Sequence, residues 1–380
     1  ENFRDGSFRS CWEDLWCPLE NEKNRPCLRF IRREIMNIGI VGFGGVGKAF
    51  LKLVYDKKNE LENEGIYIQI NYIIGRTGGV YNNHGIELQR FIDFLSNEKD
   101  ITKYCDGGKA EDINFELMLN NKDIDIMVEM TPTNKETGEP GITHIRRCLE
   151  NNINVVTSNK GPILIAYKKL YNLAKAHNVQ LGIGCTTGGA LPAINGGLMD
   201  LAGADITSIE GVLNGTTNFI LKEMEDTGCD YADALKEAQR LGIAETNPSL
   251  DVEGFDTASK LLILTNVLMN TEKTMKDISI EGITNVTPDD IKRANSLNKK
   301  YKLIGKTEIV NNELEMTVKL QLLDPSNSLY GVEGKNKAVR YISDTLGELT
   351  IIGGASGVTP AAASILRDII NINRGYKFVK

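Results

Sequence analysis

Four acidic residues and one lysine lie within residues 245–260, and their side chains could act together on a small polar molecule. The carboxylates of Glu245, Asp251 and Asp256 suit the ammonium group of an amino-acid ligand. Lys260 could stabilise negative charge on a reacting oxygen and deliver a proton to it. Asp256 and Lys260 are also four residues apart near the start of a predicted helix, where such a pair stabilises the helix by itself. The spacing therefore leaves a catalytic and a structural interpretation open.

A second group of residues is a glycine-rich turn that follows an apolar segment at 37–41 and opens a predicted helix at 45–62. The first glycine permits the turn, the second lets a pyrophosphate approach the backbone, and the third lets the helix pack close to the strand. The free N–H groups and the positive end of the helix then bind the pyrophosphate. This arrangement predicts a nicotinamide dinucleotide site, although a tight structural corner would have the same spacing. The residues of the turn are Gly42, Phe43, Gly44, Gly45, Val46 and Gly47.

The choice between the two nicotinamide dinucleotides depends on the end of the next predicted strand, 66–74. NAD-preferring sites place an acidic residue there, where it binds the ribose 2′-hydroxyl. This strand ends without an acid, and Arg76 follows it. An arginine pairs well with a 2′-phosphate, so we expect NADP, with NAD as the alternative. A surface arginine without a ligand is the structural alternative.

Strands alternate with helices through the first half of the chain, which predicts an α/β fold with a Rossmann-type, doubly wound parallel sheet. Ligands bind beyond the carboxyl ends of the strands in such sheets. We therefore expect the loop of Thr131, Pro132 and Thr133, after one strand, and the pair Asn159 and Lys160, after the next, to line the site. The predicted strands are 37–41, 66–74, 124–129, 155–157 and 180–183, and the predicted helices are 45–62, 88–95, 114–120, 143–151 and 165–177.

The pattern changes after about residue 190 and predicts a second, α+β domain. Alternating apolar residues indicate strands at 206–213 and 314–322. A last helix at 361–370 follows a glycine-rich turn at 353–357 and should pack back on the first domain. The helices expected between the two strands are 217–225, 231–240, 255–269 and 288–299.

Composition excludes several classes of protein. The 380-residue chain carries a formal net charge of -7 without basic blocks, which argues against binding nucleic acid or an anionic membrane. No apolar run is long enough for a membrane helix. The seven cysteines are scattered and form no Cys-x-x-Cys pair, so we expect a cytoplasmic protein without a disulfide framework or zinc ribbon, and an inert, buried Cys185. Residues 1–35 share no pattern with the rest and are expected to be a poorly ordered extension.

The run from Ala238 to Lys260 resembles the signature of homoserine dehydrogenases, which reads A-x3-G, then N-P-x2-D, then G-x-D-x3-K. Three further stretches are similar to segments of this family: 155–160, with its Asn-Lys pair; 214–218, an Asn-Gly-Thr-Thr-Asn turn; and the 353–359 turn. The resemblance covers about residues 36–375.

The resemblance implies reversible, NAD(P)H-dependent reduction of L-aspartate 4-semialdehyde to L-homoserine, a step in threonine, methionine and isoleucine biosynthesis. By matched position, Lys160 and Lys260 are the catalytic lysines, and the turn at Gly353 closes over the cofactor. The substrate-binding residues implied are Glu245, Asp251, Asp256, Gly215 and Thr216.

Family members also hold a monovalent cation, such as sodium or potassium, on backbone carbonyls of one loop. The matching residues are Gly184, Thr187, Gly189 and Leu191. The family often has glutamate at the position of Gly184, so this chain departs from the pattern there.

The resemblance also implies a domain plan and a homodimer. Residues 36–160, completed by 346–380, would form the NAD(P)-binding domain, and residues 161–345 the catalytic and dimerisation domain. Because the chain ends soon after Gly353, we expect a short form that lacks a C-terminal regulatory domain.

Two other functions compete with this one. The first is a different Rossmann reductase of an amino acid or semialdehyde, and the second is a non-catalytic NADP-binding sensor. The first does not require the charged block at 245–260, which therefore favours the dehydrogenase. The second predicts tight cofactor binding without turnover and tolerance of Lys260→Ala.

Overall fold

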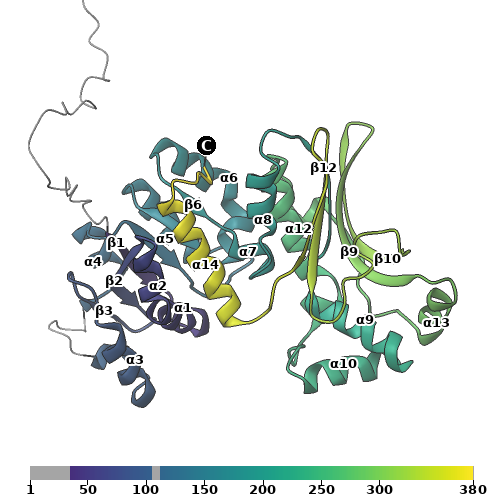
Figure 1. Ribbon diagram of the computed structural model, residues 1–380, viewed down its shortest axis with the longest axis horizontal. Coiled ribbons are helices and arrows are strands. Elements are labelled where there is room, and N and C mark those ends of the chain that lie inside the picture. The colour runs from purple at the N-terminus through teal and green to yellow at the C-terminus, as the bar shows by residue number, and fades with distance from the viewer. Residues whose placement is uncertain (1–34, 105–111, 380) are drawn as a thin grey trace, which may run out of the picture. The chain divides into compact units, whose positions relative to one another are not determined.

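The computed structural model describes residues 35–104 and 112–379. The expected N-terminal extension, 1–35, lies outside the described residues except for Ile35, which begins the first strand. The structure contains two six-stranded sheets (Figure 1).

The first sheet has the strand order β3-β2-β1-β4-β5-β6. Its neighbouring strands run parallel, except that β3 pairs antiparallel with β2 at one edge. The predicted doubly wound, Rossmann-type sheet is therefore confirmed, and it extends to Gly182. The strands are β1 (Ile35–Val41), β2 (Tyr67–Ile74), β3 (Gly79–Tyr81), β4 (Ile126–Glu129), β5 (Asn154–Thr157) and β6 (Leu181–Gly182).

Helices cover both faces of this sheet, because its strands have buried side chains on both sides. On one face, Phe50 of α1 (Gly45–Asp56), Phe91 of α3 (Leu88–Asn97) and Ile365 of α14 (Val358–Asn373) share a core. The other face packs against α4 (Phe115–Asn121), α5 (Gly141–Glu150) and α6 (Lys160–Ala176). As expected, the last helix returns to the first sheet, where α14 lies beside α1 (Figure 1).

Two details differ from the sequence prediction. The helix expected at 45–62 is interrupted at Lys57, and α2 (Lys58–Asn63) is a separate helix. The apolar face of α1 ends at Val54, and the polar residues after it leave only Leu61 of α2 to be buried. Strand β3 was also not predicted, because a tight turn at Gly75, whose N–H donates to the Gly78 carbonyl at 2.8 Å, joins it directly to β2.

The second sheet has the order β12-β11-β7-β9-β10-β8, and only two of its strands were predicted. Strand β9 was missed because Lys302, buried at 2% exposure, and Gly305 interrupt its apolar alternation. The two asparagines that join β9 to β10, at 311 and 312, have positive φ values of 50° and 65°, as a tight hairpin turn requires. The strands are β7 (Ile206–Val212), β8 (Ser279–Ile280), β9 (Lys300–Val310), β10 (Glu313–Leu323), β11 (Lys337–Ser343) and β12 (Gly347–Gly353).

Helix α12 (Phe255–Leu268) joins this sheet to the first part of the chain, because it packs on β7 and β9 and also on α6. The core beneath it is continuous from Ile163 of α6 to Leu261 of α12 and Leu303 of β9. The remaining helices are α7 (Cys185–Gly188), α8 (Ala193–Asn195), α9 (Gly215–Thr227), α10 (Tyr231–Arg240), α11 (Ser249–Val252) and α13 (Pro288–Ser296), with short turns of other helix types at Ile101–Lys103, Gly196–Asp200 and Met275–Asp277.

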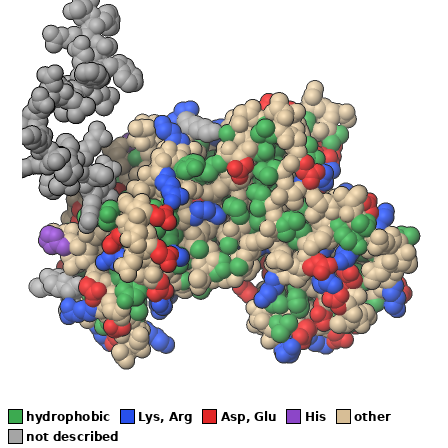
Figure 2. All heavy atoms as spheres, in the orientation of Figure 1, with side chains coloured by type: hydrophobic (Ala, Val, Ile, Leu, Met, Phe, Trp, Pro, Cys, Tyr) green, Lys and Arg blue, Asp and Glu red, His purple; other side chains and the backbone are tan. Residues whose placement is uncertain are grey.

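The surface carries mixed charge. On the face drawn in Figure 2, acidic and basic side chains are interspersed over α9, α10 and α13. Within the described part of the chain, no helix combines the length and the apolar character needed to span a bilayer.

Candidate active site

One carboxylate, that of Asp256, contacts both predicted lysines. The Lys160 ammonium donates to Asp256 Oδ1 at 2.7 Å, and the Lys260 ammonium lies 2.6 Å from Asp256 Oδ2. The side chains of the two lysines are 23% and 14% exposed, and that of the aspartate 12%. The helix-internal pair expected from the spacing therefore exists, but a third partner from a distant segment joins it. A purely local role for Asp256 and Lys260 does not account for that partner.

Two helices position these charges. Lys160 is the first residue of α6, directly after β5, where the side chain of Asn159 caps the helix by accepting from the Gly161 N–H at 3.1 Å. This cap starts α6 five residues before the predicted 165. Asp256 and Lys260 lie on the first two turns of α12, so both face the amino end of α6.

The loop that precedes α9 completes the surroundings of Asp256. The side-chain amide of Asn214 donates to Asp256 Oδ2 at 2.9 Å and to Asp251 Oδ1 at 2.7 Å. Lys260 also donates to the Leu213 carbonyl at 2.7 Å. Burial would raise the pKa of the Asp256 carboxyl, but the two ammonium groups outweigh burial and hold this pKa well below its usual range.

The glycine turn lies at the carboxyl ends of β1 and β4. Gly42 has a φ of +97°, and a Cβ there would approach the Met130 carbonyl oxygen to 2.5 Å, so no other residue fits. A Cβ on Gly44 would meet no atom within 4 Å, which leaves the backbone open to a ligand. The amino end of α1 has no capping side chain and no acid in its first turn. These features fit a pyrophosphate.

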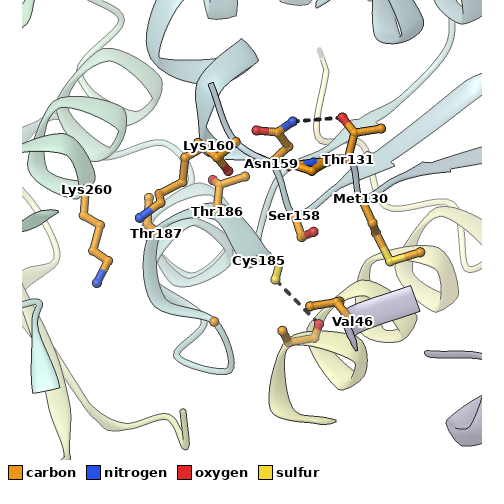
Figure 3. A pocket seen from close by; sticks show the side chains of 14 residues that line it. Val46, Met130, Thr131, Ser158, Asn159, Lys160, Cys185, Thr186, Thr187 and Lys260 are labelled. Carbon is orange, nitrogen blue, oxygen red and sulfur yellow. Dashed lines mark hydrogen bonds between the residues drawn. The ribbon is translucent and has the colours of Figure 1, made fainter. Parts of the chain in front are cut away.

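A cavity of about 350 Å³ joins the glycine turn to the lysines. Lys160 and Lys260 reach it from different helices, while Asn159 and Thr131 form another part of its wall (Figure 3). The volume suits a small metabolite beside one end of a larger cofactor. Its lining residues are Val46, Met130, Thr131, Pro132, Thr133, Ser158, Asn159, Lys160, Cys185, Thr186, Thr187, Gly189, Lys260 and Ala361.

Glu129, at the end of β4, was not predicted as part of the site. It is fully buried and accepts hydrogen bonds from the Thr131 N–H at 2.9 Å and the Thr157 hydroxyl at 2.8 Å. Burial raises the pKa of the Glu129 carboxyl, and these hydrogen bonds offset part of that rise. The residue therefore fixes the two loops that carry Thr131 and Asn159. The sequence signal that could have identified Glu129 as part of the site is an acidic residue at the end of an apolar strand.

Other predicted residues lie farther from the lysines. Glu245 and Arg76 are exposed and, within 35–104 and 112–379, make no side-chain hydrogen bond or ion pair. The Thr216 hydroxyl donates to the Ile243 carbonyl at 3.2 Å, and a Cβ on Gly215 would lie 3.0 Å from the Lys335 carbonyl oxygen, so both residues brace the start of α9. Gly353, the last residue of β12, begins the turn to α14.

Cys185 lines the cavity but is 7% exposed, and its thiol donates to the Ala361 carbonyl at 3.6 Å. Burial raises the pKa of this thiol to about 12. A thiol that stays protonated at neutral pH is a poor nucleophile, which supports the expected inert role.

Two further lysines near the site were not predicted. Lys135 lies in the loop after β4, and its pKa is lowered. Burial is the largest cause, and repulsion by the Lys160 ammonium is the next. Lys337, the first residue of β11, is 5% exposed, and burial together with the Lys260 ammonium lowers its pKa to about 8. Its ammonium donates to the Gly188 carbonyl at 2.6 Å. No strand had been predicted at 337–343, so nothing placed this lysine near the site.

The chain resembles several known proteins along most of its length. The sequence profile described as homoserine dehydrogenase matches residues 192–370. A homoserine dehydrogenase of Methanocaldococcus jannaschii is 39% identical over 342 residues, which cover 90% of this chain and 100% of that protein. An NAD(+)-dependent homoserine dehydrogenase of Pseudomonas canavaninivorans is 35% identical over 89% of this chain and 96% of its own. A solved hyperthermophilic archaeal homoserine dehydrogenase mutant in complex with NADPH has a TM-score of 0.76 at 26% identity, covering 91% of this chain and 100% of that one.

Asp256→Asn preserves the shape of the carboxylate but leaves two partly buried ammonium groups without their counter-charge. We expect a loss of about 3–5 kcal/mol in the free energy of unfolding at pH 7, measured by urea denaturation. Asp226→Asn, which breaks an exposed pair with Lys222, should cost less than about 1 kcal/mol.

The direction of the pKa shift of Asp256 also predicts how the stability difference between wild type and Asp256→Asn depends on pH. Because the pKa of Asp256 is lowered from 3.8 on folding, its contribution is complete above that value and is lost as pH falls through the depressed pKa. The difference between wild type and Asp256→Asn should therefore persist from pH 8 to about pH 5. A difference that disappears between these values would contradict the assignment.

Proposed function

The chain belongs to the homoserine dehydrogenase family, and we propose that Lys160, Lys260 and Asp256 form its catalytic centre. It is an NAD(P)-dependent oxidoreductase that interconverts L-aspartate 4-semialdehyde and L-homoserine, a step of amino-acid biosynthesis. The observation that carries the proposal is the single carboxylate that orients two ammonium groups beside the cavity.

The residues suit reduction of an aldehyde. When bound, a nicotinamide dinucleotide would supply a hydride to the carbonyl carbon, and the carbonyl oxygen would gain negative charge. The ammonium groups of Lys160 and Lys260 stabilise this charge, and one of them donates the proton that completes the alcohol. In the oxidative direction, the same nitrogen would accept the hydroxyl proton, and the hydride would pass from the carbon to the oxidised nicotinamide.

The two oxygens of Asp256, which the resemblance assigned to substrate binding, accept from the lysines and from Asn214. We assign it to positioning the lysines rather than to binding the substrate. Asp251 and the exposed Glu245 keep carboxylate oxygens for the substrate α-ammonium group.

The competing functions account for less of the site. A non-catalytic NADP sensor needs the glycine turn but no partly buried lysine pair, and two like charges on one carboxylate are costly to maintain without a task. A different semialdehyde reductase would not require the block at 245–260.

Arg76 supports NADP as the preferred cofactor. It is exposed, follows the carboxyl end of β2, and has no ion-pair partner in the described ranges. One relative is described as NAD(+)-dependent and one similar structure holds NADPH, so the family context agrees with either dinucleotide.

The expected monovalent cation fits the observed loop poorly. The Gly188 carbonyl, between the predicted ligand residues Thr187 and Gly189, already accepts from the Lys337 ammonium. The Leu191 carbonyl accepts from the Ala193 N–H at 2.8 Å. No step of the mechanism proposed above depends on a metal ion.

A homodimer in the cytoplasm remains our proposal for the working state. Strand β12 is an edge strand of the second sheet, and Ile352 on it is 53% exposed, which suits pairing with a second copy. The described cysteines, Cys148, Cys185 and Cys229, are free thiols, as in a reducing compartment. Light scattering should give twice the chain mass of 42.0 kDa, and a monomer would contradict the dimer. Cell fractionation tests the location.

Lys160→Met and Lys260→Met each keep an apolar stem but remove the ammonium group. We expect each to lower kcat about 10²–10⁴-fold in homoserine-dependent reduction of NADP⁺. Lys169→Met, on the exposed side of α6, is the matched control and should keep wild-type kcat. Wild-type kcat in both site variants would refute the catalytic assignment, and wild type that binds NADPH without turnover would favour the sensor.

Arg76→Ala tests the cofactor preference. Loss of a charge-assisted hydrogen bond to the 2′-phosphate should raise KM for NADPH about tenfold or more and leave KM for NADH within about twofold. Arg146→Ala, which breaks an exposed pair on α5, should change neither constant. An equal change of both KM values would show that Arg76 does not contact the 2′-phosphate.

A further inference from the structure

Lys337 is a buried lysine for which the proposed mechanism has no use. Its backbone begins β11 in the second sheet, while its ammonium donates to the carbonyl of Gly188, in the loop that follows the first sheet. Helix α7 ends at Gly188, where helix carbonyls lack intrahelical partners. One side chain therefore crosses from one sheet to the loop attached to the other.

The ammonium group lies inside the turn rather than at its edge. A Cβ on Gly189, whose φ is +61°, would lie 3.9 Å from Lys337 Nζ. The Gly188 carbonyl that binds the ammonium also accepts from the Leu191 N–H at 3.3 Å. Thus the positive charge stands among Gly188, Gly189 and Leu191, in the segment to which the resemblance assigns a monovalent cation.

We propose that Lys337 takes the place of a bound monovalent cation, so that this loop is held by an ammonium group of the chain itself. A protein ammonium and a sodium or potassium ion satisfy the same carbonyl oxygens, and two positive charges in one turn repel each other.

The charges around the loop agree with this assignment. Lys260 of α12 and Lys160 of α6 both interact electrostatically with Lys337, and Asp256 is the nearby carboxylate that opposes them. A bound cation would add a fourth positive charge beside the three lysines, and the Asp256 carboxylate already pairs with two of them. The buried thiol of Cys185 is the remaining titratable neighbour.

Holding this loop matters for the reaction because the loop forms one wall of the cavity. Cys185, Thr186, Thr187 and Gly189 all line it together with Lys160 and Lys260. Lys337 is therefore a positioning residue, which keeps this wall in place without touching the substrate.

The experiment measures cation dependence in two ways, by steady-state kinetics and by the thermal midpoint of unfolding. Wild type, Lys337→Ala and the exposed control Lys319→Met on β10 are compared in N-methyl-D-glucamine chloride and in KCl or NaCl at equal ionic strength. Wild type and the control should show the same kcat/KM and the same midpoint in all three salts.

Lys337→Ala should lose about tenfold or more in kcat/KM without metal salt, and K⁺, Na⁺ or methylammonium should restore activity and raise its midpoint saturably. A wild-type midpoint or activity that rises saturably with K⁺ or Na⁺ would overturn the proposal, as would a Lys337→Ala variant that needs no cation. If this variant does not fold, the wild-type measurement decides. The midpoints do not depend on the proposed catalytic roles, so the two proposals can fail separately.

Discussion

The carboxylate of Asp256 holds two ammonium groups that come from different parts of the fold. Lys260 lies one turn away on the same helix, whereas Lys160 lies at the start of α6, just after the carboxyl end of β5 in the first sheet. Burying three charges together is costly, and replacing such a group with apolar residues often stabilises a protein. The chain keeps this group at the wall of a cavity, which agrees with the proposed chemistry, because that chemistry needs positive charge beside a reacting oxygen.

In the proposed mechanism, the rest of the fold would bring a cofactor to these lysines. The glycine turn leaves the amino end of α1 open, and the buried Glu129 fixes the two loops that lie between this turn and Lys160. The chain then returns from β12 through Gly353 to α14, which packs beside α1 and contributes Ala361 to the cavity. The site is therefore built from both sheets, and each supplies a part that the other lacks.

Apart from β3, the first sheet and the charged block at 245–260 were predictable from sequence, because apolar periodicity and residue spacing are local signals. The link between Lys160 and Asp256 joins residues 96 positions apart, so only the folded chain brings them together. Asp256 was accordingly expected to bind substrate, although its oxygens are occupied by lysines and Asn214.

Most of the second sheet escaped prediction for a related reason. Strands β9 and β11 carry buried lysines, Lys302 and Lys337, whose ammonium groups reach backbone carbonyls elsewhere. Such residues look like surface positions in a sequence, so the alternation that marks a strand is broken. Lys337 therefore carried no sequence signal as a neighbour of the site, which it reaches only because the folded β11 begins beside Gly188.

The central claim is that one carboxylate makes the two lysines a single catalytic unit. The most direct test compares the rate constant of NADPH oxidation under single-turnover conditions for Lys160→Met, Lys260→Met and the double variant. Because residues that act as a unit have non-additive effects, the double variant should be about as slow as the slower single variant. Two losses that multiply in the double variant would show that the lysines act independently, and would contradict the account.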